Sequence, residues 1–296
     1  MMSYHGIRGK LMTQHRSTLL ILLAAVLVSG VFYLEYRYHR TAVSVSQESS
    51  PVIIQGGVLK DGIPAITDPV FESVAAADVY LENDGRGIVV EENGYARFYP
   101  YQILVWHEVV NDTFRGDEIL VTYCPLTFSS AVYDRTLGDE ILSFGISGKL
   151  MDSNTLLYDT KTESLWSQLK GESVEGELEG LSLTRLSSET TTWSRFKTDY
   201  PYGDVLSAET GADRDYTQDP YDREGYYDSA AVWFVLSHED VRLPAKTIVQ
   251  GYEKDGVVIA YPADYVQEQD DDRILRSAYW FAWASAYPGT KIWQRL

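Results

Sequence analysis

The chain has 296 residues, of which 45% are hydrophobic and 13% aromatic, which is the composition of a globular protein of one or two domains and not of a disordered chain. Its single cysteine excludes an internal disulfide and any multi-cysteine zinc or iron–sulfur site. Beyond residue 40, 20 basic residues face 42 acidic ones, a net charge of −22, so this part should repel nucleic acid and anionic lipid head groups.

The N-terminal region predicts a single transmembrane helix. Residues 1–16 are polar and basic, and residues 17–34 then run for 18 positions without a charge. As a helix this stretch is about 27 Å long, close to the hydrocarbon thickness of a bilayer. A signal peptide cut near Val28-Ser29-Gly30 is the alternative, but the length of the run and the lack of an Ala-x-Ala end favour an uncleaved anchor.

The charges that flank residues 17–34 indicate which side of the membrane the chain occupies. Three basic residues precede the span, and two basic residues with one glutamate follow it closely. This small bias places residues 1–16 in the cytoplasm and the rest outside, in a single-pass protein of the cell membrane. Residues 35–54 have no periodicity and are expected to be a linker, followed by a β-rich globular domain over residues 55–296.

Two hairpins with similar sequences are predicted within that domain. The first runs from Ile88 to Tyr99 around an Asn93-Gly94 turn, and the second from Thr247 to Tyr261 around an Asp255-Gly256 turn. Asn-Gly and Asp-Gly are the preferred pairs for two-residue hairpin turns. Each hairpin ends in Tyr-Pro. The turn glycines of the two copies are as far apart in the chain as the two prolines are.

A second pair of similar segments predicts two short helices. Trp193, Phe196 and Tyr200-Pro201 match Trp280, Trp283 and Tyr287-Pro288 in spacing. The i, i+3, i+7 spacing places the rings on one helical face, and Tyr-Pro ends the helix. The domain is therefore expected to contain two degenerate hairpin-plus-helix repeats.

Short alternating segments between these repeats predict further strands. They are bounded by glycine and Asn/Asp turns and lack both the strand–helix alternation and the glycine fingerprint of a nucleotide-binding fold. The expected class is α+β, mainly antiparallel β with a few short helices. The strands are expected at 118–123, 130–133, 141–146, 156–159, 181–186 and 230–236.

Residues 209–228 form an acidic, tyrosine-rich loop by sequence. Seven acidic residues and four tyrosines stand with only two arginines. The acidic residues do not match the spacing of an EF-hand, and its required glycine is missing, so a solvated loop is favoured over a calcium site. The loop is a candidate contact surface for a protein partner at the cell envelope.

Cys124 and His107 are the candidate site residues. If they face each other, the imidazole takes the thiol proton and leaves a nucleophilic thiolate, with Glu108 or Asp112 orienting the ring. The same pair could instead contribute to a soft-metal site such as copper. The structural alternative is a buried apolar cysteine at a strand end and a hydrogen-bonded histidine.

Several motifs occur in order along the chain. They are Trp106 to Asp112, Thr122 to Thr127, Phe144 to Leu150, Tyr158-Asp159 with Leu165 to Gln168, Thr191 to Trp193, Arg214 to Tyr216 with Pro220-Tyr221, and Leu243 to Lys246 with Ala260 to Pro262. Together they resemble a membrane-associated prokaryotic family, known as domain of unknown function thirty-one seventy-nine. The resemblance covers roughly residues 55 to 293 and supplies no activity. Some members have Cys-Pro-Leu-Cys where this chain has a threonine at 127, so a two-cysteine redox or metal role is not available here.

The sequence therefore favours a membrane-anchored extracytoplasmic domain with a binding or assembly role at the cell envelope. The alternative is a thiol-dependent enzyme or metal-handling protein that uses Cys124 with His107. The sequence identifies no cofactor, metal, small-molecule ligand or oligomeric state.

Overall fold

The computed structural model describes residues 51–262 and 276–293, and the expected transmembrane span at 17–34 lies outside them. Within the described ranges no helix is long and apolar enough to cross a membrane. These residues form three β-sheets, one two-stranded ribbon and five short helices. The expected class, mainly antiparallel β with a few short helices, is confirmed.

The first sheet has five strands. In sheet order they are β1 (Ile53–Gln55), β10 (Phe144–Met151), β11 (Asn154–Asp159), β12 (Leu165–Ser167) and β13 (Ser173–Glu175). All of its neighbouring strands are antiparallel. Because β1 begins at Ile53, residues 53 and 54 belong to this sheet and not to the linker expected from the sequence. The ribbon β8 (Thr136–Leu137) and β9 (Glu140–Ile141) leads into it.

The second sheet also has five strands, and the third has seven. The second is ordered β14 (Glu189–Thr192), β3 (Arg86–Glu92), β4 (Tyr95–Pro100), β15 (Asp204–Leu206) and β2 (Phe71–Ser73). The seven-stranded sheet is ordered β19 (Lys291–Ile292), β17 (Val257–Pro262), β16 (Ile248–Lys254), β18 (Arg276–Tyr279), β7 (Ser129–Asp134), β6 (Asp117–Cys124) and β5 (Val109–Phe114).

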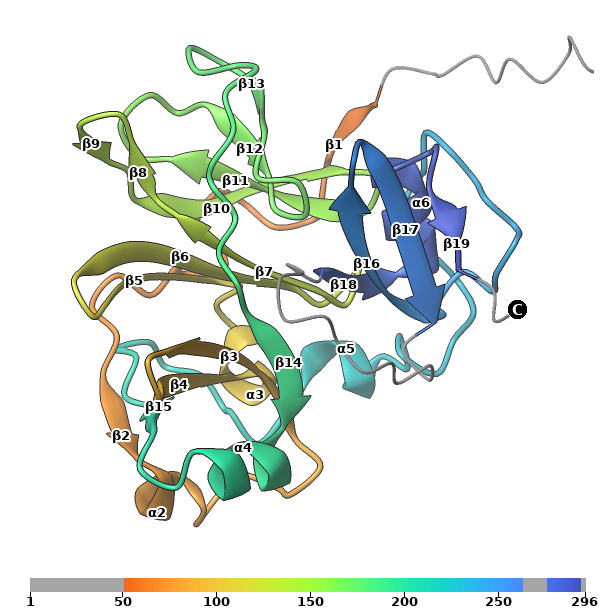
Figure 1. Cartoon of the computed structure of the whole chain (residues 1–296). Coiled ribbons are helices and arrows are strands. Elements are labelled where there is room, and N and C mark those ends of the chain that lie inside the picture. Colours follow the sequence, from red (N-terminus) through yellow and green to blue (C-terminus); the bar gives the residue numbers. More distant parts are fainter. Residues whose placement is uncertain (1–50, 263–275, 294–296) are drawn as a thin grey trace, which may run out of the picture. The chain divides into compact units, whose positions relative to one another are not determined.

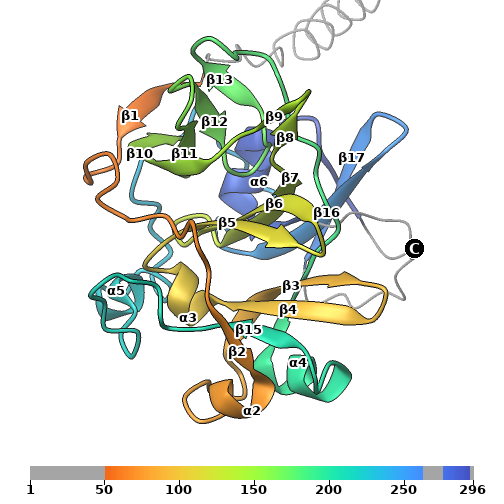
Figure 2. The ribbon, with the colours of Figure 1, turned by 90° about the vertical axis from the view of Figure 1, so that its left-hand side faces the viewer.

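Strands β5, β6 and β7 lie between the two five-stranded sheets (Figures 1 and 2). Side chains of neighbouring residues along these strands point to opposite faces and therefore pack against different sheets. Val110 and Val121 pack with the β3–β4 hairpin, whereas Val109 and Leu120 pack with β10 to β12. Burial on both faces explains the almost unbroken apolar run from Ile119 to Cys124.

The two hairpins of the predicted repeats have similar strand pairing. In both copies the hairpin has an antiparallel strand on one side and a parallel strand on the other, giving β14-β3-β4-β15 and β18-β16-β17-β19. Both turns hold two residues with positive φ, from 53° to 79°, which is the conformation that Asn-Gly and Asp-Gly favour.

The helices agree with the repeat as well. The elements α4 (Trp193–Asp199) and α6 (Trp280–Ala286) both bury their aromatic rings, and both end at a tyrosine with nearly equal dihedral angles, φ −131° and ψ 65° for Tyr200 against −133° and 71° for Tyr287. The other helices have four residues each: α2 (Val74–Ala77), α3 (Tyr101–Leu104) and α5 (Pro220–Arg223).

Two of the expected strands are wrong. Residues 181–186 form only isolated bridges, through Ser182 and Arg185. Residues 230–236 form no strand, although their apolar side chains pack onto the core beside α6. Side chains hold this segment instead: Ser153 donates to the carbonyl of Phe234, and Asp152 accepts from the Ser237 amide. The alternation of apolar residues thus marked an irregular segment that packs on an apolar surface without the hydrogen bonds of a sheet.

Candidate thiol and carboxyl site

Glu108 lies in a strained turn between α3 and β5. The Val109 N–H donates to the His107 carbonyl at 2.7 Å, and Glu108, at the centre of this three-residue turn, has φ 58°. A γ-turn with positive φ is the rare and strained form, and such strain persists only where the surrounding structure fixes it. Here the Glu108 N–H donates to Leu104, and its carbonyl accepts from the Tyr123 N–H at 2.9 Å.

The Glu108 carboxyl is buried and bound by two hydroxyl groups. Thr155, on β11 of the first sheet, donates to Oε2 at 2.8 Å, and the Tyr221 hydroxyl on α5 lies 3.5 Å from Oε1. Burial raises the pKa of Glu108 to about 7, and the hydrogen bonds offset part of that effect. The carboxyl can therefore change its protonation state near neutral pH, which is the property required of a general base.

Cys124, at the end of β6, lies on the other side of Thr155. Its Sγ is 3.3 Å from the Thr155 hydroxyl oxygen, and the thiol is fully buried. Burial raises the pKa of Cys124, and the Glu108 charge raises it further. A hydroxyl has one hydrogen and two lone pairs, so when Thr155 donates to Glu108 its oxygen can accept the S–H of Cys124. The three side chains thus form a path for one proton.

A small cavity borders this group. Its volume is about 40 Å³, enough for water but well below the roughly 300 Å³ of ordinary small-molecule pockets. Gly148, in a bulge of β10, permits the segment around Val58 to lie close to β10 at the edge of this cavity. A Cβ at this position, where φ is 76°, would lie 2.5 Å from the Val58 carbonyl oxygen. The cavity is lined by Glu108, Thr155, Tyr221, Leu126, Ile63, Ile146, Leu150, Lys149, Val58, Gly56 and Gly148.

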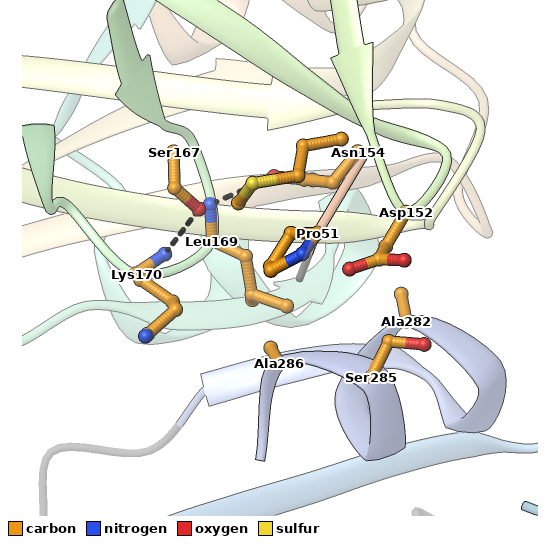
Figure 3. A pocket seen from close by; sticks show the side chains of 10 residues that line it. Pro51, Asp152, Asn154, Ser167, Leu169, Lys170, Ala282, Ser285 and Ala286 are labelled. Carbon is orange, nitrogen blue, oxygen red and sulfur yellow. Dashed lines mark hydrogen bonds between the residues drawn. The ribbon is translucent and has the colours of Figure 1, made fainter. Parts of the chain in front are cut away.

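A buried polar network is centred on Asn154, the neighbour of Thr155 in the chain. The Thr127 and Ser129 hydroxyls are 2.8 Å apart, and the Asn154 amide donates to both of them and to Gln168. A second cavity, of about 60 Å³, lies on the far side of Asn154, between the β10–β11 turn and the small side chains of α6 (Figure 3). Asn154 also accepts from the Leu169 N–H, so its polar atoms are occupied. The network fixes the chain around Cys124.

His107 has partners other than Cys124. Its Nδ1 lies 2.7 Å from the Pro64 carbonyl oxygen, so this nitrogen carries the hydrogen, and its Nε2 accepts from the Tyr216 hydroxyl at 2.7 Å. Burial lowers the pKa of the imidazole, and the nearby Arg214 charge contributes. The ring is therefore held neutral between the segment around Pro64 and the acidic loop, and its two nitrogens are engaged there.

Asp112 is placed in an ion pair with Arg97 of β4. It accepts from Arg97 Nη1 at 2.7 Å and from the Tyr99 hydroxyl at 2.6 Å. Of the four residues proposed from the sequence, the structure thus brings Cys124 and Glu108 together. Among the described residues, no group of three or more His, Cys, Asp or Glu side chains is arranged to hold a metal ion.

Thr155 and Tyr221 are not among the site residues predicted from the sequence. Tyr221 lies in the acidic 209–228 loop and in one of the motifs shared with the resembling family, and neither feature links it to Cys124. Thr155 lies 31 residues from Cys124 and 47 from Glu108, on a strand of another sheet, and no local pattern marks it.

Comparison with known proteins gives one match. A family model described as "Protein of unknown function (DUF3179)" matches residues 60–276. This range includes Cys124, Glu108, Thr155 and Tyr221. Searches of curated proteins and of solved structures gave no match.

Proposed function

The chain belongs to the DUF3179 family of proteins of unknown function, and we propose that its domain carries a thiol site in which Glu108 is the base for Cys124. One observation carries the proposal: a single hydroxyl, that of Thr155, lies 2.8 Å from the carboxylate and 3.3 Å from the sulfur. The strained backbone at Glu108 supports it, because such strain gathers at functional sites.

The chemistry is a proton transfer that generates a nucleophile. Cys124 gives its proton to the Thr155 oxygen, and Thr155 gives its own hydrogen to the Glu108 carboxylate. The product is a thiolate next to a neutral carboxylic acid, so the buried pair still carries only one negative charge. A thiolate, and not a thiol, attacks electrophilic carbon, sulfur or oxygen. Glu108 thus takes the role of base that was predicted for His107 from the sequence.

The rate of alkylation of Cys124 by a small uncharged thiol reagent, measured against pH, tests the proposal. The pair titrates as a unit, so the wild-type rate should rise in a step near the pKa of Glu108, which is about 7. Glu108→Gln and Thr155→Val should lose this step. His107→Gln is the matched control, because it changes the neighbouring residue, and it should keep the step.

A second result bears on accessibility. If Cys124 reacts only at the rate of global unfolding in every variant, the thiol has no chemistry of its own and the proposal fails. A wild-type rate that rises only at alkaline pH, with no difference in Glu108→Gln, would have the same meaning. Unfolding rates measured under the same conditions distinguish alkylation of the unfolded chain from alkylation of the folded domain.

We also propose the cellular setting expected from the sequence, in which residues 17–34 anchor the domain outside the cell membrane and the domain binds a partner at the envelope. The feature that favours binding is the irregular segment after α5. Three of its apolar side chains are exposed, Trp233 by 40%, Val235 by 59% and Val241 by 91%. A partner that covered these side chains would remove apolar surface from water.

Topology and partner capture test this second proposal. Protease added to intact spheroplasts should degrade the domain, and a domain protected from it would refute the extracytoplasmic location. A photo-crosslinker placed in the 209–228 loop should trap one partner in cells. The same crosslinker at Tyr202, an exposed residue outside the loop, serves as the control.

A further inference from the structure

Trp233 connects the protein surface with the buried site. Its ring is 40% exposed and is stacked on that of Tyr221, with centroids 6.2 Å apart and an interplanar angle of 24°. It also meets Tyr226 edge-on at 4.4 Å. Both tyrosines therefore lie within reach of electron exchange with a residue that a molecule in solution can touch.

The two tyrosines differ in what their hydroxyl groups face. The Tyr221 hydroxyl lies 3.5 Å from the Glu108 carboxyl, whereas Tyr226 donates to the Leu126 backbone carbonyl at 2.5 Å. A phenol that loses an electron becomes strongly acidic and must release its proton. A carboxylate can take that proton, but a backbone carbonyl cannot, so only Tyr221 has a base in position.

We propose that Trp233, Tyr221 and Glu108 form a path for proton-coupled one-electron oxidation, which links a one-electron oxidant at the surface to Cys124. The path rests on the proposed role of Glu108 as the base of the thiol site. It adds a class of partner to that role: a soluble one-electron oxidant, such as an oxidised metal complex or a radical.

Each step conserves atoms and charge. The oxidant takes one electron from Trp233 and leaves a radical cation. Tyr221 then gives an electron to Trp233 and its phenol proton to the Glu108 carboxylate, and becomes a neutral tyrosyl radical. The radical regains an electron from Cys124 and a proton from Glu108, while the thiol proton passes through Thr155 to Glu108. The net result is a reduced oxidant, a Cys124 thiyl radical and a protonated Glu108.

The geometry suits this order of steps because the same carboxyl accepts a proton from Tyr221 and, through Thr155, from Cys124. Oε1 faces Tyr221 and Oε2 faces Thr155, which in turn contacts the sulfur. One proton acceptor can therefore be used first by the phenol and then by the thiol. The cavity beside Glu108 gives room for water that would return the proton to solvent.

Flash oxidation of the full chain in detergent micelles tests the path. The oxidant is a photogenerated ruthenium(III) tris-bipyridine complex, and the tyrosyl radical is followed by transient absorption and electron paramagnetic resonance. Tyr221→Phe should lose the tyrosyl component seen in the wild type, and Trp233→Phe should prevent its formation. Glu108→Gln should slow its formation by about a hundredfold, the scale of a positioned base.

Tyr226→Phe is the matched control, because Tyr226 contacts the same tryptophan without a base. It should leave the radical unchanged, and an equal loss in Tyr226→Phe and Tyr221→Phe would overturn the path. So would a wild-type yield in Trp233→Phe. Cys124→Ser should give a longer-lived tyrosyl radical, and an unchanged lifetime would remove the link to the thiol.

The two proposals can fail separately. A step in alkylation rate near neutral pH together with no Tyr221 radical would leave the thiol site and refute the path. A Tyr221 radical that depends on Glu108, with no such step in alkylation, would leave the path from the surface to Tyr221 and refute the role of Glu108 as the base of Cys124.

Discussion

Replacing Glu108 by glutamine should remove a large pH dependence of stability. In the unfolded chain this carboxyl ionises near its ordinary pKa of 4.5, and in the folded domain the pKa is about 7. Between these values the folded state holds a proton that the unfolded state has released. The stabilisation is therefore fully present below pH 4.5 and is lost as the pH rises through 7.

The size of the effect follows from the two pKa values. Each pKa unit corresponds to about 1.4 kcal/mol, so a rise from 4.5 to about 7 corresponds to about 3 kcal/mol. The glutamine side chain of the variant is never charged and avoids this loss. The difference in unfolding free energy between Glu108→Gln and wild type should accordingly become more favourable to the variant with rising pH, by about 3 kcal/mol in total.

Urea unfolding of both proteins at a series of pH values measures this difference. Other titrating groups contribute equally to the two proteins and cancel when one curve is subtracted from the other. Glu177→Gln removes an exposed carboxylate and is the matched control, for which the difference should stay nearly constant. A flat difference curve for Glu108→Gln would show that the carboxyl is solvated, which would refute both its burial and its role as a base near pH 7.

Two further predictions concern neighbouring positions. The pKa of His107 is lower in the folded domain than in the unfolded chain. The stabilisation from the neutral ring is therefore fully present above pH 6.5, the ordinary pKa, and is lost as the pH falls through the pKa of the folded state. His107→Gln should accordingly flatten the acid side of a plot of Tm against pH. Gly148→Ala should cost more in urea unfolding than Gly94→Ala. Both glycines have positive φ, a conformation that costs alanine about 1–2 kcal/mol. Only at Gly148 would the added Cβ also meet a backbone atom, the Val58 carbonyl oxygen at 2.5 Å. Equal losses would mean that the segment over the cavity moves away freely.

The repeats were predictable because their signals are local. A two-residue Asn-Gly or Asp-Gly turn sets the register of its own hairpin, and rings at i and i+3 meet on one helical face whatever surrounds them. The pairing of each hairpin with one antiparallel and one parallel neighbour was not predictable. Those neighbours, such as β14 and β15 for the first hairpin, are distant in sequence and too short for a pattern of their own.

The error at residues 230–236 has a related cause. Alternating apolar and polar side chains indicate that one face of a segment is buried. A strand has such a face, and so does an unpaired segment that packs on the core. Which of the two forms depends on whether a free sheet edge lies alongside. Here the side chains of the turn residues Asp152 and Ser153 bind two backbone groups of this part of the chain, the Ser237 amide and the Phe234 carbonyl.

The sequence by itself determined the class of fold and the two hairpins with the helices that follow them, because turn chemistry and side-chain periodicity act over a few residues. The tertiary structure decided which residue faces Cys124. His107 and Glu108 are neighbours in the chain, and the positive φ of Glu108 separates their directions. One side chain goes to Pro64 and Tyr216, the other to a threonine of another sheet. The Thr155 hydroxyl, on a strand distant in sequence, reaches both Glu108 and Cys124 only after the sheets have packed.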